Sequence, residues 1–295
     1  MKKYISALLL YGANGVVASF IALESGQIVL LRCALGSLTL LALFYLGGGR
    51  LSGIGNRRDL TLLAVSAAAM AADWLLLYEA YARIGVGLPI LINYTGPAIV
   101  IALSPLILRE KLTAGKLCSL ALAMCGAVLI SGKAVSGGTD TVGIVCAALS
   151  AVAYAVMVLS NKLTTQIKGA DNALLQMLFT CAVVVVYSML RGEVKVSIAA
   201  SDLLPVLLLG IVCTGLACRL YFSSIGELPA QTVAICGYLE PLSAVLLSAL
   251  VLGERMSPVQ LLGAALIILG SLFSGAFSLH LYGNYRCTVS KHWHK

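Results

Sequence analysis

The chain has 295 residues, of which 60% are hydrophobic and only 11% are charged, and its mean hydropathy is +0.99. A soluble domain carries roughly 25% charged residues, so this composition excludes a protein with a water-facing surface. A formal charge of +8 is compatible with a nucleic-acid partner, so the positions of the basic residues along the chain have to be considered.

The apolar residues fall into long runs. About 20 apolar residues are needed to cross a bilayer as a helix. The runs therefore predict an all-α integral membrane protein of ten transmembrane helices. These cover approximately residues 4–23, 27–46, 59–81, 85–107, 113–132, 141–160, 170–190, 203–225, 229–252 and 257–277. The connectors are too short for a soluble domain, which excludes a membrane-anchored soluble enzyme. The start resembles a signal peptide, but no clear cleavage site follows, so we expect it to form the first helix.

Basic residues gather on one side of the predicted topology. The termini and the loops on their side carry Lys2, Lys3, Arg50, Arg57, Arg58, Arg109, Lys111, Lys116, Lys162, Lys168, Arg286, Lys291 and Lys295. The other side has only Arg83, Lys133, Arg191, Lys195 and Arg255. Because Lys and Arg accumulate on the cytoplasmic side, both termini are predicted to be cytoplasmic. The positive charge then indicates orientation, and no nucleic-acid partner is expected.

The stretch 94–131 recurs without a gap at 238–275, so that Tyr94 matches Tyr238 and Pro97 matches Pro241. The chain therefore divides into a first repeat (1–133), a connector (134–140), a second repeat (141–277) and a polar cytoplasmic tail (278–295). With five helices in each half, the second copy enters the membrane upside down. Such inverted repeats are typical of carriers with a central cavity between the halves.

Two prolines fall near the middle of predicted helices. Pro97 and Pro241 lack an N–H, so the carbonyls of Asn93 and Gly237 lose their helical partners. An unpaired carbonyl facing lipid costs several kcal/mol. The two prolines are therefore predicted hinges that face protein or a watered cavity; a packing kink without ligand contact is the alternative.

Two acids lie deep in predicted helices. A charge at a helix centre costs about 2.5–3.5 kcal/mol on insertion scales, so Glu240 and Asp73 are candidates for substrate binding and proton coupling. An internal salt bridge of Glu240 with Arg219 is the alternative. Arg32 lies within snorkelling reach of the outer surface, although it could also attract an anionic group.

Polar and aromatic residues near these acids complete the predicted substrate site, which comprises Asp73, Trp74, Tyr78, Asn93, Tyr94, Tyr238 and Glu240. Trp74 is either a stacking surface for a substrate or a packing residue. Glu79 and Arg83 are spaced as an ion pair on one helix face. Glu110 is expected to stabilise a helix corner, with Thr113 and Ser257 as N-caps of the helices that follow the two corners. No catalytic residues, metal site or cofactor are predicted, because the cysteines are scattered and the three histidines lie at or beyond the end of the last predicted helix.

These residues together resemble the two repeats of EamA-type transporters in the drug/metabolite transporter superfamily. The resemblance rests on paired short motifs along nearly the whole chain: 73–81, 94–97 and 109–113 in the first copy, and 228–234, 238–241 and 252–254 in the second. The first copy departs from the common Leu-Gly-Glu ending, because Arg109 stands between Leu108 and Glu110. The resemblance implies ten helices in two inverted repeats around a cavity, and export of small metabolites without ATP.

We therefore expect a secondary transporter in the bacterial cytoplasmic membrane that moves amino-acid-like or drug-like compounds by alternating access. Its expected partners are a small-molecule substrate and the lipid bilayer, with no obligate protein partner. A facilitated-diffusion uniporter is the nearest alternative. From other classes, a membrane scaffold or sensor and an intramembrane enzyme are the alternatives; the enzyme is disfavoured because the predicted spans contain no histidine.

Overall fold

The computed structural model describes residues 1–49, 51, 55–85, 87–131, 140–192, 194, 196–251, 257–270 and 272–273. Within these residues the regular structure is entirely helical. The helices are α1 (Lys2–Ala18), α2 (Ser25–Leu46), α3 (Arg57–Ile84), α4 (Gly87–Asn93), α5 (Gly96–Ile107), α6 (Ala114–Ser131), α7 (Thr141–Lys162), α8 (Gly169–Arg191), α9 (Leu203–Leu207), η2 (Leu208–Leu216), α10 (Ala217–Ile225), α11 (Ala230–Gly237) and α12 (Leu239–Val251). A further apolar helix spans Pro258–Gly270. The predicted tail (278–295) lies outside the described residues.

In the described part of the chain, six helical stretches are long and apolar enough to cross a membrane. They are Ser25–Leu46, Arg57–Ile84, Thr141–Lys162, Gly169–Arg191, Leu203–Ile225 and Ala230–Val251. Shorter apolar helices span Gly96–Ile107, Ala114–Leu129 and Pro258–Gly270. The sequence prediction of an all-helical, highly apolar chain is therefore confirmed.

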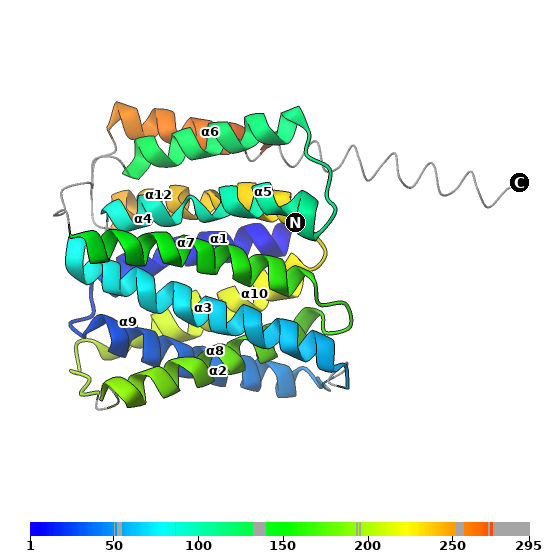
Figure 1. Ribbon diagram of the computed structural model, residues 1–295. Coiled ribbons are helices and arrows are strands. Elements are labelled where there is room, and N and C mark those ends of the chain that lie inside the picture. The colour runs from blue at the N-terminus through cyan, green and yellow to red at the C-terminus, as the bar shows by residue number, and fades with distance from the viewer. Residues whose placement is uncertain are drawn as a thin grey trace, which may run out of the picture.

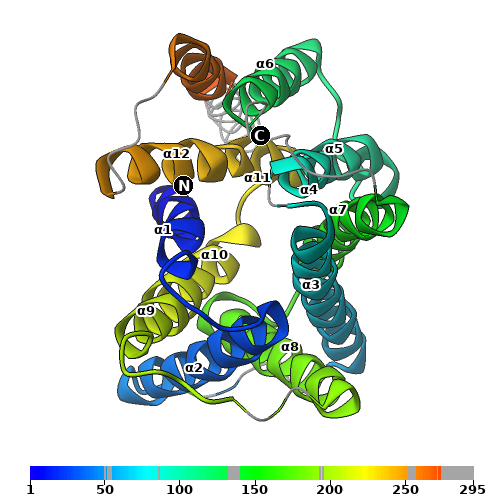
Figure 2. The same cartoon turned by 90° about the vertical axis from the view of Figure 1, so that its left-hand side faces the viewer.

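The helices run side by side between two ends of the molecule (Figure 1). We call the end where α1 begins the N-terminal end, and the end where α2 begins the opposite end. Figure 2 looks along the helices from the opposite end, and shows α1, α3, α8 and α10 around the centre with α4 and α11 along one side. Helix α6 lies outside this ring.

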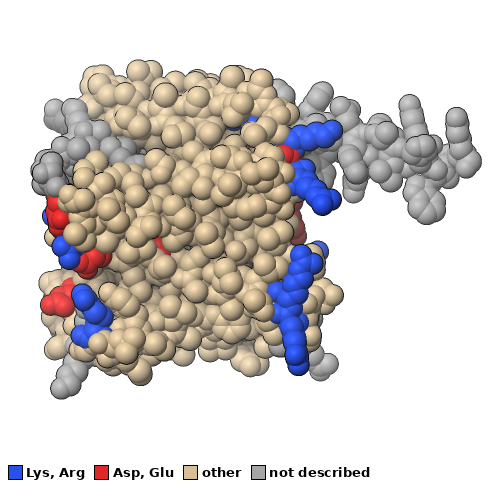
Figure 3. All heavy atoms as spheres, in the orientation of Figure 1, with Lys and Arg blue, Asp and Glu red and all other residues tan. Residues whose placement is uncertain are grey.

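The outer surface between the two ends is apolar. In Figure 3 the charged side chains gather at the two ends, and the body between them carries almost none. Leu46, Leu106, Leu190 and Leu250 each expose at least 80% of their surface. Burial in lipid removes the cost of exposing such side chains to water, which explains why the fold directs them outward.

Two of the predicted membrane helices are broken rather than kinked. Between α4 and α5 the chain makes a turn at Tyr94 and Thr95, and between α11 and α12 it makes one at Tyr238. Pro97 and Pro241 each fall in the first turn of the new helix. A helix tolerates proline there because the missing N–H would have had no helical partner. The breaks therefore lie where the sequence predicts hinges, one turn earlier than the prolines themselves.

Side chains near the helix starts explain several of the boundaries. Asn56 accepts hydrogen bonds from the backbone N–H groups of Arg58 and Asp59 at the start of α3. The predicted N-caps are confirmed, because Thr113 accepts from Lys116 N–H and Ser257 accepts from Gln260 N–H. The first helix ends at Ala18, five residues short of the expected boundary.

Glycines bring α6 and the Pro258–Gly270 helix into close contact. A Cβ at Gly126 would lie 2.5 Å from the carbonyl oxygen of Gly263, and one at Gly270 would lie 2.7 Å from that of Ser119. Small residues are the usual means by which membrane helices approach closely. The matched positions Gly126 and Gly270 of the sequence repeat therefore both serve this one helix pair.

A side chain at Gly126 should separate these two helices. We expect Gly126→Leu to destabilise the protein by about 1–3 kcal/mol, as overpacking does in other cores, and to lower its melting temperature in detergent. Gly226→Ala is the matched control, because a Cβ there meets nothing within 4 Å. Equal melting temperatures for Gly126→Leu and the control would contradict the close packing.

Candidate functional site

A cavity of about 490 Å³ lies among the helices. Its wall takes residues from α1, α2, α3, α4, α5, α7, α10, α11 and α12. The polar and aromatic members of the wall are Tyr11, Asn14, Ser19, Ser25, Arg32, Asp73, Trp74, Tyr78, Tyr81, Asn93, Tyr94, Tyr154, Tyr221, Phe222, Tyr238 and Glu240. At 490 Å³ the cavity falls within the size range of small-molecule sites.

The predicted site residues lie together on this wall. All seven of the predicted substrate-binding residues line the cavity: Asp73, Trp74, Tyr78, Asn93, Tyr94, Tyr238 and Glu240. Of the two predicted hinges, Pro97 also lines the cavity, whereas Pro241 is buried and is not part of the lining. Residues that are far apart in the chain thus line one cavity.

The two broken helices meet at their matched tyrosines. The rings of Tyr94 and Tyr238 have centroids 6.1 Å apart, and the Tyr238 hydroxyl donates a 2.7 Å hydrogen bond to the Tyr94 carbonyl. The backbone break at Tyr94 leaves this carbonyl available, so the hydroxyl of the second copy satisfies an acceptor of the first. Such a bond contributes about 0.5–1.5 kcal/mol.

Asp73 is held by a side-chain amide. Asn93, the last residue of α4, donates from Nδ2 to Asp73 Oδ1 at 3.0 Å and to Ser150 Oγ at 3.0 Å. This network joins α3, α4 and α7 at the point where α4 ends. Movement of α4 would therefore disturb the environment of the Asp73 carboxyl.

The position that carries Glu240 in the second copy is occupied by glycine in the first. A Cβ at Gly96 would lie 2.9 Å from Cδ1 of the Tyr154 ring and 3.0 Å from the Ala151 carbonyl oxygen. Tyr154 fills the space that a side chain would need, and its own ring lines the cavity. The first copy has no room for a side chain at position 96, which explains why it carries glycine where the second copy carries Glu240.

Sequence reasoning missed four tyrosines of the wall: Tyr11, Tyr81, Tyr154 and Tyr221. Tyr11 and Tyr221 pack with ring centroids 5.7 Å apart, and the Tyr11 hydroxyl contacts Cys218 Sγ at 3.2 Å. A tyrosine in an apolar helix gives no sign of which way it faces. The concentration of tyrosine in a chain poor in other aromatic residues was the available signal.

The alternative reading of Glu240, an internal salt bridge with Arg219, is not observed among the described residues. Arg219 is half-buried on α10, is absent from the cavity wall, and forms no ion pair with Glu240 in the described part of the chain. Helix α10 presents Tyr221 and Phe222 to the cavity instead. The cation that shares the cavity with the acids is Arg32, whose guanidinium carbon lies 4.1 Å from the centre of the Trp74 ring.

At the N-terminal end, hydrogen bonds between the two halves of the chain and within the second half hold the helices together. The Glu110 carboxylate accepts from the backbone N–H groups of Ala230 and Gln231, at 2.6 and 3.2 Å. It therefore caps α11. The sequence predicts a role for Glu110 only at its own helix corner, whereas the structure shows a contact with a helix of the second half. Lys162 binds the carbonyls of Ile225 and Leu228 at the end of α10. An anion at a helix start and a cation at a helix end are both favoured by the helix dipole.

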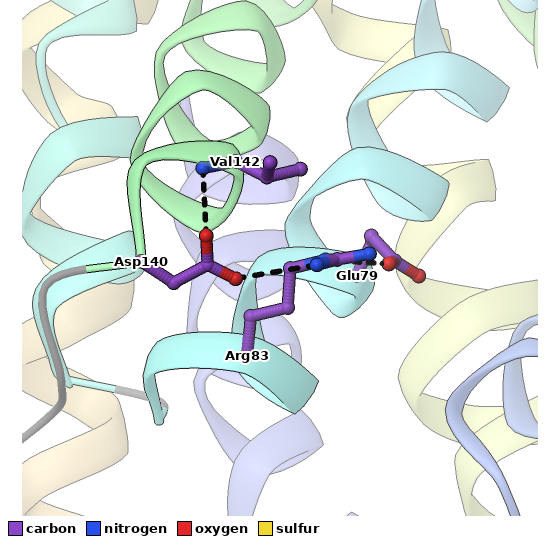
Figure 4. A network of polar contacts seen from close by, with 4 residues as sticks. All are labelled: Glu79, Arg83, Asp140 and Val142. Atoms are coloured by element: carbon purple, nitrogen blue, oxygen red, sulfur yellow. Dashed lines mark hydrogen bonds and ion pairs between the residues drawn. The ribbon is translucent and has the colours of Figure 1, made fainter.

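At the opposite end an ion-pair network joins α3 to the start of α7 (Figure 4). Arg83 Nε lies 2.8 Å from Glu79 Oε1 and Arg83 Nη1 lies 3.2 Å from Asp140 Oδ2, which confirms the predicted Glu79–Arg83 pair. Asp140 also accepts from the Val142 N–H. This backbone hydrogen bond and the Arg83 guanidinium hold the pKa of the Asp140 carboxyl below its usual value. Because all three charged groups are partly exposed, the network contributes little to stability.

The cavity reaches the opposite end of the molecule and stops short of the N-terminal end. Ser19, which follows α1, and Ser25, which begins α2, both belong to its wall, and Ser19 is exposed. Towards the N-terminal end the Tyr4 hydroxyl bonds the Val233 carbonyl at 2.8 Å, and Tyr4 is fully buried. Among the described residues, no group of three or more His, Cys, Asp or Glu side chains is placed to hold a metal ion.

Comparison with known proteins identifies the family. The model of the EamA-like transporter family matches residues 4–132 and again residues 141–276. The chain belongs to this family. It is therefore a multi-pass membrane transporter.

Two relatives of this EamA-like chain are also named as transporters. An uncharacterized transporter, YxxF, of Bacillus subtilis (strain 168) is 24% identical over 273 residues, which cover 91% of this chain and 86% of that protein. An uncharacterized transporter of Clostridium kluyveri is 25% identical over 175 residues, covering 57% of this chain and 56% of that protein. A crystal structure with 17% identity superposes with a TM-score of 0.81 over 95% of this chain and 97% of that one, which shows the shared fold.

The stacking of Arg32 on Trp74 can be detected by fluorescence, because Trp74 is one of only two tryptophans in the chain. In a Trp293→Phe background, we expect Arg32→Gln to change the emission of Trp74 measurably, since the cation over its ring is lost. Arg219→Gln, which alters a residue outside the cavity wall, should leave the spectrum unchanged. A spectrum that responds to Arg219→Gln and not to Arg32→Gln would contradict this arrangement.

Proposed function

We propose that this transporter is a secondary carrier that moves small metabolites across the bacterial cytoplasmic membrane, most simply outward, by alternating access. The observation that carries the proposal is the cavity of about 490 Å³ at the point where both broken helices change direction. Broken helices at the centre of a bundle are the usual substrate sites of such carriers. The proposed substrate contacts are Asp73, Trp74, Tyr78, Asn93, Tyr94, Tyr238 and Glu240.

Ten membrane helices in two inverted repeats, 1–133 and 141–277, are part of this proposal. The double match of the family model supports it, as does the hydrogen bond between the matched residues Tyr94 and Tyr238. Matched helix pairs also pack alike: α1 packs on α12 as α7 packs on α5, and α2 packs on η2 as α8 packs on α3. These are the contacts that a two-fold relation between the halves would produce.

The distribution of charge supports cytoplasmic N- and C-termini. In Figure 3 Lys and Arg line the N-terminal end, whereas the opposite end mixes basic and acidic side chains. Lys and Arg concentrate on the cytoplasmic side of membrane proteins. In this orientation the cavity reaches the outside, and the contacts of Tyr4, Glu110 and Lys162 close the cytoplasmic end.

Alternating access would then consist of a change at the two helix breaks. Opening the cytoplasmic end requires Glu110 to leave the start of α11 and Lys162 to leave the end of α10. Because Pro97 and Pro241 follow the breaks directly, each broken helix can change angle there without losing further backbone hydrogen bonds. The second halves, α5 and α12, would rotate about these hinges.

Glu240 and Asp73 are the proposed proton carriers. Both line the cavity, neither forms an ion pair among the described residues, and a charged acid at membrane depth is costly. A proton taken up from the outside would neutralise the acid and be released to the cytoplasm in exchange for substrate. Uniport down the substrate gradient is the alternative that the test below distinguishes.

Transport should depend on these acids. Metabolite profiling of cells with and without the protein identifies the transported compounds, and flux is then measured in liposomes across a pH gradient. We expect Glu240→Gln and Asp73→Asn to lower gradient-driven flux by at least about tenfold and to remove its pH dependence, because an amide carries no exchangeable charge.

Glu227→Gln is the control, because Glu227 is exposed in the loop between α10 and α11. It should retain the wild-type rate and pH profile. If both acid variants keep the wild-type pH dependence, proton coupling through them is wrong and uniport is favoured. If the protein changes no metabolite and produces no flux, the carrier function itself is wrong.

A further inference from the structure

Three buried amide side chains lie next to the cavity and have no part in the proposed function. Asn161 of α7 and Asn172 and Gln176 of α8 are each at most 2% exposed. Asn161 Nδ2 donates to Asn172 Oδ1 at 3.0 Å and to Gln176 Oε1 at 3.2 Å. Asn172 Nδ2 donates back to Asn161 Oδ1 at 2.9 Å. We call these three residues the amide cluster.

The amide cluster lies directly behind the cavity wall, on the side of the N-terminal end. Its α7 member follows the wall residue Met157 by one helical turn, in the direction of the N-terminal end. Its two α8 members contact, in chain order, the carbonyl of Phe222 at 3.2 Å and Sδ of Met70 at 3.6 Å, and both of these residues line the cavity. Lys162, the next residue of α7, makes the closing contacts with α10. The cluster therefore occupies the layer between the cavity and the closed end.

Gln176 is the counterpart of Arg32 in the other half of the chain. The offset of 144 residues between the two matched tyrosines also separates Arg32 from Gln176. It separates Met70 from Thr214 as well. Arg32 Nε donates to Thr214 Oγ1 at 3.2 Å. Gln176 Nε2 contacts Met70 Sδ at 3.6 Å. Matched residues thus make matched contacts, although Arg32 lines the cavity and Gln176 lies behind Met70.

Opening of the cytoplasmic end would give Gln176 the place that Arg32 has now. Alternating access in such carriers moves one repeat against the other around a fixed site, so matched residues border the cavity in turn. Arg32 borders it while the opposite end is open. Its counterpart then borders it when the N-terminal end is open, once Met70 has moved aside.

The amide of Gln176 is poorly satisfied where it lies. A side-chain amide has two N–H donors and sulfur is a weak acceptor, yet the thioether of Met70 is the acceptor that the described residues provide. A buried donor without a good partner is costly. The pairing of Asn161 with Asn172 would by itself join α7 to α8. A polar solute in the place of Met70 would offer Gln176 an oxygen instead.

We propose that the amide cluster is a second subsite, which binds an uncharged hydroxyl or carboxamide group of the transported compound when the cytoplasmic end is open. Amides donate and accept hydrogen bonds without carrying charge. The partners of the cluster among the described residues are also uncharged. This inference rests on the proposed function and names the chemistry of its cytoplasmic side, where Gln176 replaces the cation Arg32.

Accessibility tests whether the amide cluster opens to the cytoplasm. The full-length protein, with its nine cysteines replaced by alanine, carries Gln176→Cys and is treated in inside-out vesicles with a sulfonated, membrane-impermeant methanethiosulfonate reagent. Glu110→Gln and Lys162→Gln are then added, which removes the charges at the closed end. We expect the reaction to become at least about tenfold faster, because losing a helix cap favours the open state. Val184→Cys, two turns farther along α8 and equally buried, is the control and should not respond.

Matched neutral and anionic probes test the chemistry of the subsite. The purified protein with Glu110→Gln and Lys162→Gln is titrated calorimetrically with glucose and gluconate, nicotinamide and nicotinate, and propionamide and propionate. The members of each pair differ chiefly in a carboxylate. We expect the neutral member of at least one pair to bind at least about tenfold more tightly, because amides leave a buried carboxylate without an opposite charge.

Variants then assign this preference to the amide cluster. Gln176→Met keeps the length of the side chain but removes its amide, and should weaken binding of the preferred neutral probe at least about tenfold. Asn161→Ser keeps a hydroxyl, should weaken it severalfold, and tests the subsite where Gln176→Met folds poorly. Thr180→Val is the control, because it removes a buried hydroxyl of α8 that bonds the Ala67 carbonyl outside the cluster. It should bind the probe as the parent does.

The inference is overturned if Gln176→Cys stays unreactive after the closing charges are removed. It is also overturned if no neutral probe is preferred over its carboxylate, or if Gln176→Met and Asn161→Ser both bind the probes as the parent does. Flux in liposomes separates this failure from that of the proposed function. A protein that transports while Gln176→Cys remains sealed refutes the subsite and leaves the carrier intact.

Discussion

A polar backbone group inside a membrane must find a partner within the protein, because an unsatisfied N–H or carbonyl in hydrocarbon costs several kcal/mol. This constraint governs the arrangement of the whole molecule. Two helices are broken, at Tyr94 and at Tyr238. Each break leaves backbone groups without a helical hydrogen-bond partner, and lipid provides no replacement. The breaks therefore have to face the interior, and the Tyr238 hydroxyl supplies the partner of the Tyr94 carbonyl.

The same constraint explains the charges. A cavity that accommodates broken backbone also admits side chains that lipid would reject, and Asp73, Glu240 and Arg32 are all found on its wall. Lipid-facing positions such as Leu250 remain apolar. The fold thus separates an apolar exterior from a polar centre, and this separation is what a carrier needs to take a charged solute across the bilayer.

Much of this architecture can be read from the chain, because depth along a helix follows from counting residues. The helical segments could be predicted in this way, and the two proline hinges lie within about one turn of the breaks, although the sequence predicts kinks rather than breaks. The direction in which a side chain faces around the helix axis does not follow from counting residues. Arg32 and Arg219 both lie within apolar spans, yet only Arg32 faces the cavity. Its contact with Trp74 depends on how α2, α3 and η2 pack, which no local pattern records.

Transport by the proposed mechanism requires that water reaches the broken helices at the centre of the molecule. Its direct test is the reaction of single cysteines with a membrane-impermeant thiol reagent applied from outside intact cells. Tyr94→Cys, at the break between α4 and α5, should react with this water-soluble reagent, whereas Leu250→Cys, which is 81% exposed on the apolar exterior, should react only with a lipid-soluble one. A Tyr94→Cys that only the lipid-soluble reagent modifies would contradict the account.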